Sequence, residues 1–194
     1  MRAWSWWDHV YLYGLIVYIA IRGRFGARTK HNEKVVRRVD VRDRALVALV
    51  FIGSMILPLL YLFTHWLAFA DYSFPQFVPW CGAVVMLFAL WLFWRSHVDL
   101  GLNWSITLEI RKDHELVERG VYRRVRHPMY TAIFLFSIAQ GLLLPNWLAG
   151  WSALVSFALL YLSRVGREEQ MMREFFGESY VAYMQRTGRL WPMK

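Results

Sequence analysis

Arg164, Glu168 and Glu169 follow directly after a long uncharged stretch, residues 128–163, and His127 comes directly before it. An imidazole, a guanidinium and carboxylates gathered at one place can bind and orient a polar reacting group. Charges at the edge of a lipid bilayer are costly without partners, so they often mark a functional site. The pattern therefore indicates chemistry on a molecule that lies partly in lipid.

Simpler structural interpretations of these residues stay open. Arg164 and Glu168 are four residues apart, so on a helix they share one face and could form only an exposed ion pair. Glu169 would then be a solvated neighbour, and His127 an ordinary interfacial side chain. The two residues lie where an apolar helix leaves the membrane, and this position favours a functional site over an exposed ion pair.

The uncharged segments predict a membrane protein. The chain has 194 residues, of which 57% are hydrophobic and 18% aromatic. A membrane-spanning helix needs about 20 mostly apolar residues. Residues 45–70 and 72–94 contain no Asp, Glu, Lys or Arg, and a weaker apolar segment covers residues 6–21. Three spans are therefore expected in the first half of the chain.

Residues 128–163 are too long for a single crossing at about 1.5 Å per helical residue. Pro145 and Asn146 in this stretch predict a turn between two short helices. We therefore expect an all-α, polytopic integral membrane protein with five transmembrane helices, of which the last two form a helical hairpin.

The distribution of Lys and Arg residues predicts the orientation of the chain in the membrane. All Lys and Arg residues except Arg2 and Arg95 lie in residues 22–44, 111–126 and 164–194. Five spans place these three segments on one side, and positive residues favour the cytosol. The N-terminus is then outside and the C-terminus cytosolic. The formal charge of +9 is explained by topology, and no nucleic-acid partner is expected because no recognition motif accompanies it.

The chain divides into two parts on this basis. Residues 1–100 would hold the three spans and a basic cytosolic connector, residues 22–44. Residues 101–194 would form the candidate catalytic part. Its three segments are a cytosolic loop, the helical hairpin and a cytosolic C-terminal helix: residues 101–127, 128–163 and 164–194.

The loop and the C-terminal helix are expected to pack together as a cofactor pocket. The loop mixes apolar and charged residues, which is unusual for a free surface loop. Apolar residues at helical spacing continue beyond Arg164, and Gly177 predicts a break between two helices. His114 and His127 have no cysteine near them and no zinc-ligand spacing, so no metal is expected. A glycine-rich nucleotide motif is also absent from the sequence.

An ordered series of motifs carries a family resemblance over roughly residues 100–192. The chain resembles the isoprenylcysteine carboxyl methyltransferases and the related membrane phospholipid methyltransferases. The motifs that carry it are His114-Glu115-Leu116-Val117, Gly120-Val121-Tyr122, Arg126-His127-Pro128-Met129-Tyr130, Glu168-Glu169, Phe176-Gly177, Tyr180, Tyr183, Arg189 and Pro192. Ala132 stands where relatives often have glycine.

The resemblance implies S-adenosylmethionine as the methyl donor, S-adenosylhomocysteine as its product and a site at the cytosolic membrane face. Arg164 and Glu168 are the implied catalytic residues, with Arg164 facing the methyl acceptor. Acids and aromatic rings suit a donor that carries a sulfonium and an ammonium. The implied donor-binding residues flank the hairpin: His114, Glu115, Leu116, Val117, Tyr122, His127, Pro128, Met129, Tyr130 and Glu168.

The implied acceptor is lipophilic: an isoprenylcysteine-like carboxylate, either a small molecule or a protein C-terminus. A carboxylate is ionised at neutral pH and needs no general base, so the protein must supply alignment and exclude water. The short chain favours a prokaryotic inner membrane, with the endoplasmic reticulum as the alternative. The sequence identifies neither the natural acceptor nor the oligomeric state.

Three rival functions stay open. A phospholipid amine N-methyltransferase would need a base, for which Glu169 or His127 could serve. A sterol-reductase-like enzyme using NADPH has a similar His-Pro-x-Tyr hairpin but is generally larger. A membrane scaffold without enzymatic activity is the third.

Overall fold

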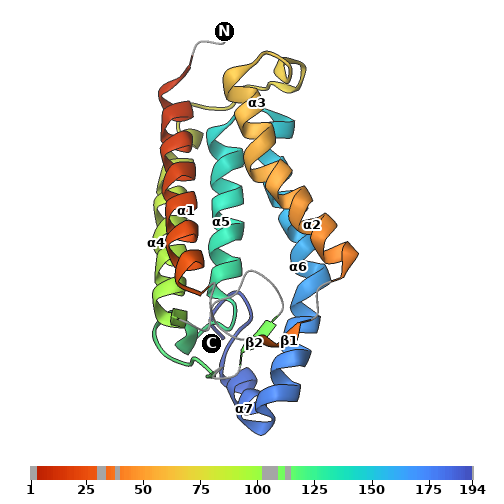
Figure 1. Cartoon of the computed structure of the whole chain (residues 1–194). Coiled ribbons are helices and arrows are strands. Elements are labelled where there is room, and N and C mark those ends of the chain that lie inside the picture. Colours follow the sequence, from red (N-terminus) through yellow and green to blue (C-terminus); the bar gives the residue numbers. More distant parts are fainter. Residues whose placement is uncertain (1–3, 30–33, 38–39, 102–108, 112–114, 194) are drawn as a thin grey trace.

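The computed structural model describes residues 4–29, 34–37, 40–101, 109–111 and 115–193. In these ranges the chain forms seven α-helices and two short strands (Figure 1). In chain order they are α1 (Trp6–Thr29), β1 (Lys34–Arg37), α2 (Val41–Phe51), α3 (Leu57–Phe63), α4 (Val78–Leu100), β2 (Glu109–Arg111), α5 (Pro128–Leu143), α6 (Trp147–Phe176) and α7 (Glu178–Arg186). A π-helical segment, Ile52–Ile56, joins α2 to α3.

Two groups of helices stand side by side, and α5 lies between them (Figure 1). In the first group α1 packs on α4, and α4 packs along α5. In the second group α2 and α3 pack on α6, which also contacts α5. The N-terminus lies at one end of the bundle and the C-terminus at the other (Figure 1). The two groups diverge toward the C-terminal end.

Four helical segments are long and apolar enough to cross a membrane. They are Trp6–Ala27, Val41–Phe63, Val78–Leu100 and Trp147–Phe176. The fifth predicted span corresponds to α5, which has 16 residues. A helix of that length extends about 24 Å, less than the hydrocarbon core of about 30 Å. The protein is thus an integral multi-pass membrane protein with four candidate spans in its described part, where the sequence predicted five.

The predicted second and third spans differ from the helices at the outer connection. Lack of charge over residues 45–70 predicts a span that continues to Ala70, but the helix ends at Phe63, and Thr64 is extended with ψ 174°. The chain then crosses to α4, which begins at Val78 rather than at residue 72. An uncharged run does not distinguish apolar loop from helix. Pro79 in the first turn of α4 marks the true start.

Pro58 explains how the helix through residues 41–63 joins its neighbours inside the membrane. Proline has no N–H, so Pro58 cannot donate a helical hydrogen bond to the carbonyl of Ser54 or, in the π-helical register, to that of Gly53. The Tyr11 hydroxyl donates to the Ser54 carbonyl over 3.1 Å. The Gly53 carbonyl accepts from Gln140 Nε2 and Ser152 Oγ. These bonds tie the segment to α1, α5 and α6.

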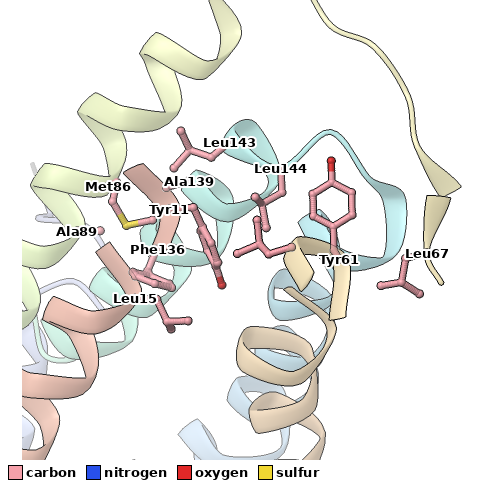
Figure 2. Packing of buried hydrophobic residues seen from close by; sticks show 12 residues of the cluster. Tyr11, Leu15, Tyr61, Leu67, Met86, Ala89, Phe136, Ala139, Leu143 and Leu144 are labelled. Atoms are coloured by element: carbon pink, nitrogen blue, oxygen red, sulfur yellow. The ribbon is translucent and has the colours of Figure 1, made fainter. Parts of the chain in front are cut away.

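The apolar core lies toward the end of the bundle at which α5 turns into α6. Figure 2 shows side chains from α1, α3, α4 and α5 meeting there. The cluster contains Tyr11, Leu15, Tyr61, Leu62, Leu67, Met86, Ala89, Phe136, Ala139, Leu143, Leu144 and Ala149. Asn146 caps α6 in the turn, accepting from the backbone of Leu148 and Ala149 and donating to Asp71. The two helix groups are therefore joined firmly at this end.

A small antiparallel sheet is added to the expected all-α fold. β1 pairs with β2, with Lys34 opposite Arg111 and Val36 opposite Ile110. Part of the basic connector at residues 22–44 is therefore a strand. The two strands are short and far apart in sequence, so no local sequence pattern predicts that they pair.

Candidate active site

A cavity of about 770 Å³ lies where the two helix groups diverge. Its walls come from α1, α2, α5 and α6, and residues 115–117 and α7 also contribute to the lining. α5 begins, and the chain ends, at the same end of the bundle (Figure 1). The first turn of α5 therefore brings His127 and Tyr130 to this end of the cavity, while apolar residues of α1 and α2 line it toward the bundle interior.

The structure brings most of the site residues predicted from sequence to this one cavity. Nine of them line it: Glu115, Leu116, Val117, Tyr122, His127, Met129, Tyr130, Arg164 and Glu168. Pro128 is the buried first residue of α5 and supports the lining residues beside it. His114 lies outside the described residues.

Glu168 and Tyr130 form a polar contact between α6 and α5 at the cavity. The Tyr130 hydroxyl donates to Glu168 Oε2 over 2.6 Å. The ring of Tyr130 stacks beside His127, with ring centres 5.4 Å apart. One face of the cavity thus presents a half-buried carboxylate next to two aromatic rings.

Glu169 is buried, with 2% of its surface exposed, so the simpler interpretation of this residue as a solvated neighbour of Glu168 is wrong. Three basic side chains surround it. Arg126 Nε donates to Glu169 over 3.1 Å, Arg189 Nη2 over 2.6 Å, and His127 Nε2 lies 3.3 Å away. Hydrogen bonding to Glu169 raises the pKa of Arg189 above its usual value. Glu169 therefore fixes the position of His127.

The C-terminal tail forms one side of the site. The Gly188 carbonyl accepts from Arg126 N over 2.8 Å, and the Arg189 carbonyl accepts from His127 N over 2.9 Å. A Cβ on Gly188 would lie 1.7 Å from the Trp191 carbonyl oxygen, so only glycine fits this turn. The tail is thereby paired with the segment that enters α5.

Arg164 pairs with Asp43 rather than with Glu168, the partner that i, i+4 spacing suggests. Arg164 Nη2 donates to Asp43 Oδ2 over 3.0 Å, and both side chains are buried. Asp43 lies in the first turn of α2, far away in sequence. Asp43 was not among the residues predicted from the sequence, although an acid just ahead of an uncharged span was an available signal.

Asp99 holds the loop that carries Tyr122. Its carboxylate accepts from Val121 N over 2.9 Å, and a Cβ on Gly120 would lie 2.0 Å from Asp99 Oδ2. The Tyr183 hydroxyl of α7 donates to the Tyr122 carbonyl over 2.6 Å. Burial raises the pKa of Tyr183, so this hydroxyl stays a donor at neutral pH. The loop, α4 and α7 thus form one unit at the cavity.

The sequence model of the isoprenylcysteine carboxyl methyltransferase family matches residues 81–174 of the chain. Protein-S-isoprenylcysteine O-methyltransferase B of Arabidopsis thaliana is 31% identical over 92 residues, which is 46% of this chain and 47% of that protein. Protein-S-isoprenylcysteine O-methyltransferase of Dictyostelium discoideum is 31% identical over 122 residues, or 58% of this chain and 50% of that protein.

A solved structure also resembles this fold. The eukaryotic intramembrane Ras methyltransferase ICMT aligns with a TM-score of 0.54 at 28% identity, covering 77% of this chain and 50% of that one. Over residues 81–174 the chain is therefore similar to the isoprenylcysteine carboxyl methyltransferase family. It spans about half the length of these relatives.

Proposed function

We propose that this protein is an S-adenosylmethionine-dependent methyltransferase that esterifies the carboxylate of an isoprenylcysteine-like, lipophilic acceptor. One observation carries the proposal. Arg164 and Glu168, one helical turn apart on α6, line the same cavity as the apolar side chains of α1, α2 and α5. An orienting cation, a donor-binding acid and a lipid-compatible wall are therefore next to each other.

The polar end of the cavity fits the methyl donor. Glu168 can accept from an ammonium or a ribose hydroxyl, and the rings of Tyr130 and His127 offer faces to a sulfonium. Leu116 and Val117 line the cavity and suit an adenine ring. His114, Glu115, Tyr122, Pro128 and Met129 remain part of the proposed donor site through the family resemblance.

The apolar part of the cavity fits the tail of the acceptor. Val47, Val50 and Phe51 of α2 line it together with Leu15 and Ile19 of α1. The aromatic-rich α4 contributes Leu100 to the lining, so the proposed tail site lies between α1 and α2.

When bound, S-adenosylmethionine supplies a methyl group on sulfur: the acceptor oxygen bonds to that carbon, the carbon–sulfur bond breaks, and a methyl ester and S-adenosylhomocysteine result. The acceptor carboxylate is already ionised, so no side chain has to remove a proton. Arg164 orients the carboxylate, and such alignment can supply about 7–11 kcal/mol. The apolar walls exclude water, which keeps the carboxylate reactive.

The arrangement of Glu169 argues for a carboxylate acceptor over a lipid amine. An ammonium must lose a proton before it attacks, so an N-methyltransferase needs a free base. Glu169 is held by Arg126 and Arg189, and His127 lies against it. Both groups suggested as that base are therefore engaged in structural contacts.

We also propose five crossings, with α5 as a short one, and a cytosolic location for the polar end of the cavity. The opposite placement of the two termini in the bundle (Figure 1) agrees with an odd number of crossings. The clustering of Lys and Arg near that end supports the cytosolic assignment. A prokaryotic inner membrane is the favoured location.

A labelling experiment tests the reaction. The purified protein receives S-adenosylmethionine labelled in its methyl group, with either a prenylcysteine analogue or phosphatidylethanolamine as acceptor. The proposal predicts label in the prenylcysteine product and its release as methanol in mild alkali. Label confined to alkali-stable phosphatidylethanolamine would point to the N-methyltransferase instead.

A further inference from the structure

The ion pair between Arg164 and Asp43 is incomplete in a specific way. Arg164 is 6% exposed and Asp43 is 1% exposed. They are joined through Arg164 Nη2 and Asp43 Oδ2. Among the residues that the structure describes, Arg164 Nε and Asp43 Oδ1 have no hydrogen-bond partner although both atoms are buried. A buried Nε cannot be reached by a ligand, so Nη1 is the guanidinium nitrogen that remains open to one.

Asp43 is held firmly in place. The side chain of Asp40 caps α2 by accepting from Asp43 N over 2.7 Å. Arg167, one turn below Arg164 on α6, donates to Asp40 over 3.0 Å and lies 3.6 Å from Asp43 Oδ1. The first turn of α2 is thus tied to α6 by two acids and two guanidiniums. Arg164 cannot turn away from the cavity without breaking its bond to this fixed acid.

We propose that Asp43 is a positioning residue, which holds Arg164 so that Nη1 is the nitrogen open to the carboxylate of the acceptor. This inference rests on the proposed methyltransferase function. A free guanidinium grips a carboxylate through two parallel hydrogen bonds. Because Nη2 donates to Asp43 and Nε is buried, Arg164 offers the acceptor a single-oxygen contact through Nη1, and the second oxygen stays available for methylation.

The negative charge of Asp43 has a second effect on the reaction. Methyl transfer removes the charge of the acceptor carboxylate, so an interaction with that charge is stronger before the transition state than in it. Such an interaction tightens substrate binding without accelerating the chemical step. Asp43 partly offsets the charge of Arg164 and therefore keeps the acceptor from being bound too strongly.

Asp43→Asn separates this role from a purely structural one. Asparagine keeps the shape and an oxygen that accepts from Arg164, but it removes the charge. We expect kcat to fall by about tenfold and KM for the acceptor to fall by about threefold, because the carboxylate is then bound more tightly in the ground state. Glu178→Gln, at the exposed start of α7, is the matched control: it also removes one negative charge but lies outside the network around Asp43, so both constants should stay within about twofold of wild type.

A binding measurement on the wild-type protein tests the same inference and does not require that the variant folds. Tryptophan fluorescence can follow binding of a prenylcysteine acid and of its carboxamide. A single, charge-compensated contact predicts that the acid binds less than about tenfold more tightly than the carboxamide. In Asp43→Asn this preference should increase.

The outcomes are distinct. A wild-type preference for the acid above about a hundredfold would overturn the inference, as would Asp43→Asn with unchanged kcat and KM or with a raised KM. These results leave the methyltransferase proposal standing if the wild-type protein methylates the prenylcysteine analogue. Absence of methyl transfer by the wild-type protein, with binding preferences as expected, would count against the proposed function alone.

Discussion

Tyr130 and Glu168 are joined by a hydrogen bond of 2.6 Å from the tyrosine hydroxyl to Oε2 of the carboxylate. The bond links the first turn of α5 to α6 at the cavity. It fixes one carboxylate oxygen and leaves the other available to a ligand. Glu168 is therefore placed to bind the methyl donor while its orientation is set by a neighbouring helix.

Glu168→Gln should weaken the binding of S-adenosylhomocysteine. Loss of a charge-assisted hydrogen bond costs about 1.5–3 kcal/mol, so we expect a rise in Kd of roughly tenfold or more. Isothermal titration of the purified protein measures this directly. Glu178→Gln, at the exposed start of α7, is the control and should bind like wild type. An unaltered Kd in Glu168→Gln would remove Glu168 from the donor site.

Arg164→Lys should lose methyl transfer and keep donor binding. Lysine preserves the charge but lacks the planar fork through which Arg164 reaches Asp43 and the acceptor. We expect kcat/KM for the acceptor to fall by about a hundredfold, with the Kd of S-adenosylhomocysteine unchanged. Arg173→Lys, an exposed change on the same helix, serves as the control. Equal turnover by Arg164→Lys and wild type would show that the guanidinium does not orient the acceptor.

Glu169→Gln should lower the stability of the folded protein and not only its activity. Glutamine leaves Arg126, whose side chain is 8% exposed, as a buried cation without its counter-ion. Removal of one partner from such a pair costs about 3–5 kcal/mol, which a lower Tm in detergent would report. Glu174→Gln, exposed on the same helix, should leave the Tm in place. If both variants have the same Tm as wild type, the cluster around Glu169 contributes little to stability.

Gly120→Ala tests the packing of the loop that carries Tyr122. Gly120 has φ 58°, and a Cβ there would lie 2.0 Å from Asp99 Oδ2. Gly177 has nearly the same φ, 55°, with open space around it. Alanine at either position has a backbone cost of about 1–2 kcal/mol. Gly120→Ala should lower the Tm further and weaken S-adenosylhomocysteine binding; equal effects of the two variants would show that the contact with Asp99 is not needed.

Local signals in the sequence were enough to predict much of the helical framework. Pro145 and Asn146 lie in the turn between α5 and α6, and Gly177, with its positive φ, separates α6 from α7. Each of these features depends on one or two residues whose backbone preferences are strong. The ordered motifs around His127 and Glu168 likewise predicted residues that line one cavity.

Long-range contacts could not be predicted in the same way. Spacing on α6 suggests that Arg164 pairs with Glu168, but the buried Asp43 of α2 is its partner. Glu169 resembles Glu168 in sequence, yet packing buries one among basic side chains and leaves the other at the cavity. Such choices depend on which helices meet, and a helical repeat carries no information about that.

A solved structure with S-adenosylhomocysteine and a prenylcysteine acid bound together would test the central claim most directly. The account predicts both molecules in the cavity lined by Arg164 and Glu168, with the donor product against Glu168 and one carboxylate oxygen of the acceptor on Nη1 of Arg164. The prenyl chain should lie between α1 and α2. Density for either molecule outside this cavity, or an acceptor carboxylate that does not contact Arg164, would contradict it.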